Sequence, residues 1–274
     1  MDIKFEKDKI YIKNTANFDL AQTLDCGQAF RWTQNDDGVW RGIAFGKYIE
    51  LYEKDGDIII SGTNQQDFDN LWANYFDLHR DYAKIIKEVS VNETVRKAAE
   101  YSSGIRLLNQ EPWEALCSFI ISQNNNIPRI KGIIERLCEN FGTKTHSGYT
   151  FPSAQTISAL SVEDLSVIRS GFRAKYIIDA ANKVTSGEID LEQLKHTDYD
   201  TARGILMTIK GVGPKVADCV LLYGLSHIEA FPRDVWINRA LTQLFEGKIP
   251  NCAVQYGGIV QQYIFHYIRN HQQL

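Results

Sequence analysis

The stretch IKGVGPKVADC, residues 209–219, decides the fold because two glycines and a proline separate two apolar segments. The apolar residues on either side have helical spacing, and the glycines between them permit a tight turn. Pro214 suits the first turn of a helix, where its missing N–H removes no hydrogen bond. The stretch therefore predicts a helix, a tight turn and a second helix, with Lys215 at the start of the second helix.

Lys215 occupies an electrostatically unfavourable position in this arrangement. A helix N-terminus carries the positive end of the macrodipole, which disfavours a cation by a few tenths to about 1 kcal/mol. Residues that break a local rule without an evident gain are expected at functional sites. Lys215 is therefore a candidate for chemistry rather than for stability.

The glycine turn comes close to two nucleotide-binding motifs and matches neither. A dinucleotide fingerprint needs a third glycine at the position of Val216, and a phosphate loop needs serine or threonine there. Gly211 and Gly213 instead let a backbone approach a ligand closely. The free N–H groups at the following helix start, including that of Val216, then favour an anion such as a DNA phosphate. An ordinary pair of packed helices with glycines at the turn is the alternative.

A carboxylate lies at the start of the next amphipathic helix, in FPRDVWINRAL, residues 231–241. By itself Asp234 is most simply an N-cap, which is worth about 1 kcal/mol. Together with Lys215 it places a nucleophile and a carboxylate on two successive helix starts. That combination suits a single catalytic pocket.

The rest of the chain divides into a strand-rich and a helix-rich part. From Phe30 to Ser61, aromatic and β-branched segments alternate with short turn sequences, which predicts an antiparallel meander. From about Gln66 onward, apolar residues recur three and four apart, which predicts helices, including one in AQTISALSVEDLSVIRSG, residues 154–171.

The expected fold class is therefore α+β. Residues 1–100 are expected to form an antiparallel β-sheet domain with flanking helices, and residues 101–274 an all-helical body that contains the helix-hairpin-helix.

Composition excludes several classes of protein. The five cysteines are scattered without a C-x-x-C pair, which argues against a disulfide framework, a zinc site or an iron–sulfur ligand run. No apolar run reaches the roughly 18 residues of a membrane span, and the N-terminus lacks the apolar core of a secretion signal. We therefore expect a soluble, intracellular protein.

The net charge of −4 at first argues against a nucleic-acid partner. The excess of acid lies in residues 1–100, where 18 acidic residues face 13 lysines and arginines, whereas residues 101–274 hold 16 and 17. A basic face on the second part is compatible with these numbers.

Further motifs follow one another in a specific order. They are CGQAFRW at 26–32, FIISQNNNIPRI at 119–130 and GFRAKYI at 171–177, followed by the glycine turn and FPRDV. In this order they resemble the eukaryotic-type 8-oxoguanine DNA glycosylases of the helix-hairpin-helix superfamily, over nearly the whole chain. Related endonucleases carry four cysteines after the aspartate; here only Cys252 follows it, so the iron–sulfur branch is excluded.

The resemblance implies a bifunctional DNA glycosylase and abasic-site lyase. Lys215 would attack C1′ of the damaged nucleoside, expel the base and leave a Schiff base, from which β-elimination cuts the strand. An amine attacks only when neutral, and a helix N-terminus, an apolar surround and nearby cations all disfavour the cation. Asp234 would stabilise positive charge on the sugar while capping its helix. No cofactor is required; a structural cation at the hairpin backbone is compatible with the pattern.

The resemblance also implies a pocket for an extruded base. The Gly27 carbonyl would accept a hydrogen bond from N7–H of 8-oxoguanine, Phe265 would stack on the base, Gln261 would read its Watson–Crick edge and Cys219 would face its other side. The plain alternatives are a turn glycine for Gly27, core packing for Phe265 and a small buried side chain for Cys219.

On the opposite strand the resemblance assigns Asn124 to the space left by the base, Arg129 and Arg173 to the orphaned cytosine, and Phe172 to a wedge beside it. The polar run NNNIPR, residues 124–129, is expected to be a loop.

Two residues depart from the family pattern. Pro128 precedes Arg129, and Trp236 replaces a histidine that contacts phosphate in close relatives.

The expected partner is double-stranded DNA containing 8-oxoguanine, bound by a monomer without membrane contact. Two other functions stay open: a glycosylase of the same superfamily for another damaged base, which Lys215 argues against, and a helix-hairpin-helix scaffold that only binds DNA.

Overall fold

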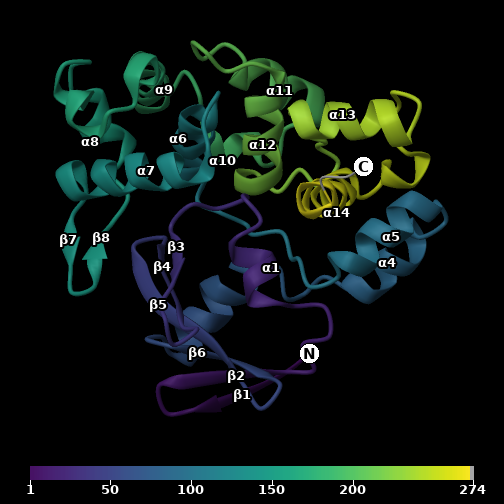
Figure 1. Cartoon of the computed structure of the whole chain (residues 1–274). Helices are drawn as coiled ribbons and strands as arrows, with labels where there is room; N and C mark the ends of the chain where they lie inside the picture. The colour runs from purple at the N-terminus through teal and green to yellow at the C-terminus, as the bar shows by residue number, and fades with distance from the viewer. Residues whose placement is uncertain (272–274) are drawn as a thin grey trace. The chain divides into compact units, whose positions relative to one another are not determined.

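The computed structural model describes residues 1–271 and begins with a six-stranded sheet in the order β1-β2-β6-β5-β4-β3 (Figure 1). The strands are β1 (Asp2–Glu6), β2 (Lys9–Lys13), β3 (Trp32–Gln34), β4 (Trp40–Ala44), β5 (Lys47–Lys54) and β6 (Asp57–Ser61). The recorded pairings β1–β2, β2–β6, β3–β4 and β5–β6 are all antiparallel. The meander expected from Phe30 to Ser61 is therefore confirmed.

The structure adds β1 and β2, which the sequence analysis did not anticipate. Ile10 and Ile12 of β2 are at most 1% exposed, and Ile10 lies opposite the buried Ile60 of β6. The turn between the two strands uses Lys7 at φ +50°, so no glycine marks it in the sequence. Because the turn has no glycine and the segment is rich in charged residues, the sequence does not indicate this hairpin.

Helices make up most of the chain after β6. They are α1 (Leu20–Leu24), α2 (Gln65–Asp67), α3 (Ala73–Tyr75), α4 (Tyr82–Val89), α5 (Glu93–Tyr101), α6 (Pro112–Ser122), α7 (Ile127–Phe141), α8 (Ala154–Ser158), α9 (Ala174–Thr185), α10 (Leu191–Leu194), α11 (Tyr199–Leu206), α12 (Pro214–Gly224), α13 (Val235–Leu244) and α14 (Gly257–Asn270). Phe68–Trp72 is π-helical, and Asp164–Ile168, Gly171–Arg173 and Asn251–Ala253 are 3₁₀-helical.

The expectation of an all-helical body is wrong in one detail. Strands β7 (Lys144–Thr145) and β8 (Gly148–Tyr149) form a small antiparallel ribbon between α7 and α8. Gly148 has φ +140°, and the Thr145 hydroxyl donates to its carbonyl at 3.0 Å. A two-residue turn closes too short a ribbon for strand periodicity to show in the sequence.

The helix expected over residues 154–171 is divided. Helix α8 ends at Ser158, and a 3₁₀-helix starts at Asp164. The Asp164 carboxylate accepts from the backbone N–H and the hydroxyl of Ser161, so this pair starts a new element. Arg169 then ends it in the left-handed conformation at φ +57°.

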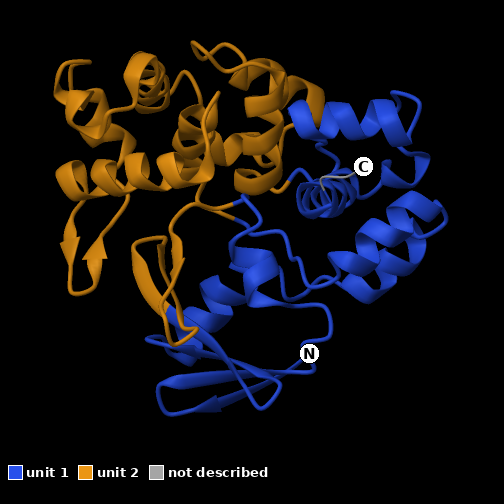
Figure 2. Ribbon diagram, in the orientation of Figure 1, with its two compact units in different colours: residues 1–28, 50–109, 227–274 blue, residues 29–49, 110–226 orange. Residues whose placement is uncertain are grey.

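The chain forms two compact units (Figure 2). Unit 1 comprises residues 1–28, 50–109 and 227–274, and unit 2 comprises residues 29–49 and 110–226. This division follows compactness, so the domain boundary expected between residues 100 and 101 stays a prediction.

Within residues 1–271 no helix combines the length and the apolar composition needed to cross a membrane.

Candidate functional site

The helix-hairpin-helix predicted from the glycine turn is present in unit 2 as α11, a turn and α12. Gly211 has φ +78°, and a Cβ atom built on it would lie 2.3 Å from the Tyr176 ring, so only glycine fits there. Gly213 is the N-cap of α12, and a Cβ there would meet nothing within 4 Å. Val216 is 3% exposed.

Lys215 lies in the first turn of α12, as the sequence predicted. Its Nζ donates to the Ser122 hydroxyl at 3.3 Å and lies 5.5 Å from the centroid of the Phe119 ring. The Ser122 hydroxyl itself donates to the Phe119 carbonyl at 2.8 Å, which turns its lone pairs toward the amine. Within unit 2 no carboxylate lies within ion-pair distance of Lys215. Sequence reasoning missed Ser122, which is the last residue of α6.

Asp218 joins the two helices of the hairpin three residues after Lys215. Its Oδ1 accepts from the Tyr199 hydroxyl at 2.9 Å and from Nε of Arg203 at 2.6 Å, both on α11. Burial raises the pKa of Asp218, and its two donors oppose this shift. The start of α12 is thereby fixed against α11.

Cys219 is 3% exposed and follows Lys215 by four residues on α12. Positions four apart on a helix share a face, so the thiol lies on the same face as the amine. This placement fits both the base-contact prediction and the plain reading as a small buried side chain.

The polar run 124–129 is shorter as a loop than expected. Helix α7 begins at Ile127, because the Asn126 side chain accepts from the backbone N–H of Arg129 at 3.0 Å and Pro128 fits the first helical turn. The prediction of a loop through Arg129 is therefore wrong at its C-terminal end. Asn124 remains outside the helix at φ +45° and is exposed.

The two arginines predicted to read cytosine have different environments. Arg173 is 2% exposed, and its guanidinium donates to the carbonyls of Gln123, Asn124 and Ser170, with the Asn124 bond at 3.0 Å. The guanidinium of Arg129 is exposed and has no hydrogen-bond partner among the described residues of unit 2. Arg173 thus shapes the backbone around Asn124, whereas Arg129 keeps its donors available.

Phe172 is exposed, at 51%, as expected for a wedge. The Arg173 guanidinium lies 4.5 Å from its ring centroid, and the Tyr176 ring contacts it edge-on with centroids 5.8 Å apart. The Phe172 ring is therefore held by Arg173 and Tyr176 and keeps about half of its surface exposed.

In unit 1, Asp234 caps α13 as predicted. Its Oδ1 accepts from the backbone N–H of Ile237 at 2.8 Å, and the residue is half-buried. Among the described residues of unit 1, its second oxygen accepts no hydrogen bond. Trp236, Arg239 and His271 line a small hollow in unit 1.

Helix α14 of unit 1 carries the two residues predicted to bind the base. Gln261 is 4% exposed, and its Oε1 has no hydrogen-bond partner among residues 1–271. Phe265 follows one turn later and is half-buried, with the Arg269 guanidinium 5.5 Å from its ring centroid. A buried amide oxygen without a donor is uncommon in proteins and requires an explanation.

Gly27 lies in a turn of unit 1 at φ +90°, a conformation that favours glycine.

Among the described residues, no group of three or more His, Cys, Asp or Glu side chains is arranged to hold a metal ion. The cation at the hairpin backbone stays a prediction.

Comparison with known proteins gives consistent matches along the chain. Residues 10–116 match the family described as 8-oxoguanine DNA glycosylase, N-terminal domain, and residues 117–249 match the HhH-GPD superfamily base excision DNA repair protein. The N-glycosylase/DNA lyase of Saccharomyces cerevisiae is 33% identical over 87% of this chain and 70% of its own. A probable N-glycosylase/DNA lyase of Methanothermobacter thermautotrophicus is 33% identical over 86% of this chain and 81% of its own.

A solved structure also matches this chain over nearly its whole length. It is the 8-oxoguanine glycosylase/lyase of Clostridium acetobutylicum in complex with double-stranded DNA containing cytosine opposite 8-oxoguanine. The identity is 36%, the TM-score is 0.92, and the match covers 99% of both chains. The chain therefore belongs to the 8-oxoguanine DNA glycosylase family, within the helix-hairpin-helix superfamily of base-excision repair proteins.

Proposed function

We propose that this chain removes 8-oxoguanine from double-stranded DNA, preferably opposite cytosine, and then cleaves the strand through a Schiff base on Lys215. The observation that carries the proposal is the position of Lys215 in the first turn of α12, beside the Ser122 hydroxyl and the Phe119 ring. These two neighbours direct the amine, and no carboxylate of unit 2 pairs with it. An amine acts as a nucleophile in its neutral form, which a carboxylate partner would disfavour. We place the activity inside the cell, where the DNA lies.

The chemistry assigns one role to each of two residues. The neutral Nζ of Lys215 attacks C1′, the bond from C1′ to the base breaks, and the base leaves with the electron pair and takes up a proton. Opening of the sugar gives a Schiff base at C1′, and loss of a proton from C2′ expels the 3′ phosphate. Asp234 stabilises positive charge on the sugar through the carboxylate oxygen that its helix cap leaves open within unit 1.

Recognition of the base is supported by Gln261 and Phe265. The unpartnered Oε1 of Gln261 gains a donor when a purine edge binds, and Phe265 offers a half-buried ring one turn along α14. In this proposal the Gly27 carbonyl distinguishes 8-oxoguanine, which carries N7–H, from guanine, which carries a lone pair there. Cys219 faces the base from α12.

DNA binding is assigned to the hairpin and to the loop before α7. The backbone N–H groups around Gly211, Gly213 and Val216 contact phosphate, because a helix start leaves such groups without intrahelical acceptors. Arg129 reads the orphaned cytosine directly, and Asn124 fills the space left by the base.

Borohydride trapping tests this proposal. Reduction of the Schiff base should join the chain covalently to a duplex that holds 8-oxoguanine opposite cytosine, and Lys215→Gln should abolish both trapping and strand cleavage while lesion binding persists. Undiminished trapping in the variant would refute the assignment of Lys215. An uncut duplex after long incubation with the unmodified chain would favour a binding-only scaffold, and trapping only on another damaged base would favour a related glycosylase.

A further inference from the structure

The turn that carries Gly27 is held from both sides by buried glutamines. Gln28 follows Gly27 and is 0% exposed, and Gln262 of α14 is 2% exposed. Neither residue touches a base in the proposed function. Both lie in unit 1 together with Gly27.

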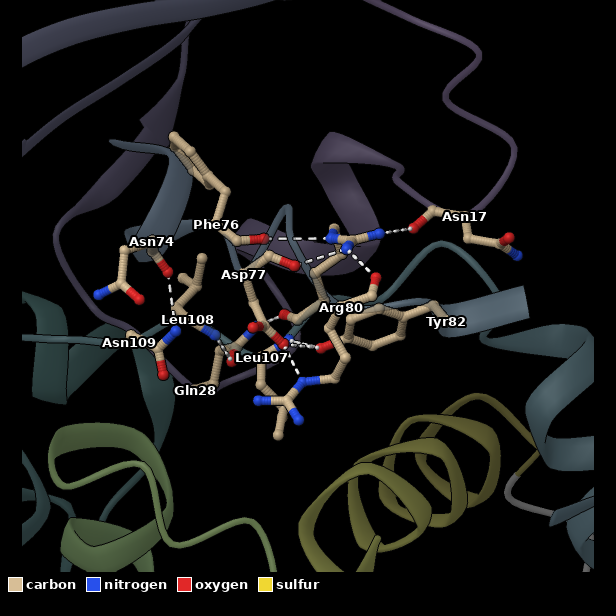
Figure 3. Close-up of polar contacts among 11 residues, drawn as sticks. Asn17, Gln28, Asn74, Phe76, Asp77, Arg80, Tyr82, Leu107, Leu108 and Asn109 are labelled. Carbon is tan, nitrogen blue, oxygen red and sulfur yellow. Dashed lines mark hydrogen bonds and ion pairs between the residues drawn. The ribbon is translucent and has the colours of Figure 1, made fainter. Parts of the chain in front are cut away.

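Gln28 fixes the residue after Gly27. Its Nε2 donates to the carbonyls of Thr23 and Arg106, both at 2.8 Å. Its Oε1 accepts from the backbone N–H of Leu108 at 2.9 Å (Figure 3). Both amide hydrogens and the amide oxygen are therefore engaged. A side chain with three buried hydrogen bonds to backbone cannot rotate without leaving polar groups unpaired.

The segment that receives Gln28 is itself rigidly held. Arg106 is 2% exposed, and its guanidinium donates to the carbonyls of Asn17 and Phe76, both at 3.1 Å, and lies 4.2 Å from the Tyr82 ring centroid. The Tyr82 hydroxyl donates to the Asp77 carboxylate at 2.9 Å and accepts from the backbone N–H of Leu107 at 2.8 Å (Figure 3). Gln28 is therefore anchored to a segment that is itself held by a buried polar network.

Gln262 fixes the residue before Gly27. Its Nε2 donates to the Cys26 carbonyl at 3.3 Å. Gln262 is also the neighbour of Gln261, the residue that we assign to the Watson–Crick edge of the base. One hydrogen bond thus connects the helix that reads one edge of the base to the turn that reads N7.

We propose that Gln262 and Gln28 are positioning residues that hold the Gly27 carbonyl in a fixed direction and thereby set the discrimination between 8-oxoguanine and guanine. This inference rests on the proposed function. A rigid carbonyl accepts from N7–H of the lesion and opposes the lone pair of guanine N7, whereas a carbonyl that can turn away loses both effects. Discrimination at this atom therefore depends on rigidity as much as on the presence of the carbonyl.

Gln262→Met tests the inference, because methionine keeps the length of the side chain and removes the donor to Cys26. Gln22→Met is the matched control: Gln22 lies on α1 in unit 1, and its side chain bonds to the backbone of Gly104 and Tyr101 rather than to residues 26–28. Each variant is assayed for single-turnover excision of 8-oxoguanine opposite cytosine and for cleavage at a preformed abasic site. Abasic-site cleavage needs Lys215 but no base.

Gln262→Met should slow 8-oxoguanine excision at least about tenfold, a factor that corresponds to about 1.4 kcal/mol, and leave abasic-site cleavage within about twofold of the unmodified chain. In a Lys215→Gln background, it should also narrow the ratio of dissociation constants between guanine and 8-oxoguanine duplexes. Gln22→Met should change neither the rate of 8-oxoguanine excision nor the ratio of dissociation constants. Equal loss of excision and abasic-site cleavage would show a general structural role and overturn the inference, as would equal behaviour of the two methionine variants.

Gln28→Met provides a second readout. It should also lower excision, because the Gln28 side chain makes three hydrogen bonds to backbone, and the guanine to 8-oxoguanine binding ratio should narrow in whatever fraction remains folded. An unchanged ratio in folded Gln28→Met would also overturn the inference. If the unmodified chain cleaves abasic sites but never excises 8-oxoguanine, the proposed function itself fails.

Discussion

Alanine at Gly211 and alanine at Gly213 should have very different effects, although the two glycines are separated by one residue. At Gly211 the chain has φ +78°, and a Cβ would lie 2.3 Å from the Tyr176 ring. The left-handed conformation costs a non-glycine residue about 1–2 kcal/mol, and displacing a packed ring costs about 1–3 kcal/mol. The sum predicts that Gly211→Ala lowers the free energy of unfolding by about 2–5 kcal/mol.

Gly213 provides the internal control. Its backbone is at φ −99° and ψ −177°, which any residue adopts, and a Cβ there would meet nothing within 4 Å. The only expected cost of alanine is the weaker N-cap, which is below about 1 kcal/mol. Gly213→Ala should therefore fold almost as stably as the unmodified chain.

Urea unfolding at 25 °C measures both values, and binding to an undamaged duplex measures the effect on the hairpin. Gly211→Ala should lose affinity for DNA because the shifted turn misdirects the N–H groups at the start of α12. If the two variants lose the same stability, or if Gly211→Ala loses less than about 1 kcal/mol, then Tyr176 does not restrict this turn and the steric reasoning is wrong.

Three further predictions follow from the same residues. Asp234→Asn keeps the helix cap but removes the charge, so the melting temperature should change little while single-turnover excision falls about 100-fold or more; a variant that melts much lower and cuts normally would contradict the catalytic role. Arg129→Ala should narrow the preference for cytosine over adenine opposite the lesion, which we expect to be at least about tenfold, and equal excision rates opposite both bases in the unmodified chain would exclude this role. Burial raises the pKa of Glu114, beside Arg31, to about 7. A carboxyl group whose pKa is raised on folding favours the folded state at low pH. The free energy of unfolding of the unmodified chain should therefore fall by about 1–3 kcal/mol relative to that of Glu114→Gln as the pH rises from 4.5 to 7. Parallel pH profiles of the free energy of unfolding in the two chains would contradict this prediction.

The parts of the fold that sequence predicts are those whose signals are local. Gly211, Pro214 and Asp234 each have one conformational preference, and the structure places them in a turn, a first helical turn and an N-cap accordingly. The first hairpin was missed because Lys7 adopts a positive φ that its residue type does not indicate. The end of the polar loop was misplaced because Asn126, an N-cap, lies within a run of identical residues.

Side chains whose function depends on distant partners are beyond the reach of local patterns. Ser122 contacts Lys215 from 93 positions away, and Gln262 reaches Cys26 across 236 positions. In the sequence both are ordinary polar residues on helices. Only the folded chain shows that one directs the amine and the other holds the turn beside Gly27.

The two arginines near the predicted cytosine site illustrate why residue type alone does not assign a role. Both are permanent cations with five donors, and both fall in motifs of the family. Arg173 directs four hydrogen bonds at the carbonyls of residues 123, 124 and 170 and is 2% exposed, which suits a residue that builds the loop around Asn124. Arg129 is exposed on the first turn of α7, where Pro128 stiffens the backbone and the guanidinium stays free to reach a base. We therefore propose that Arg129 reads cytosine directly, and that Arg173 contributes by fixing the backbone around Asn124.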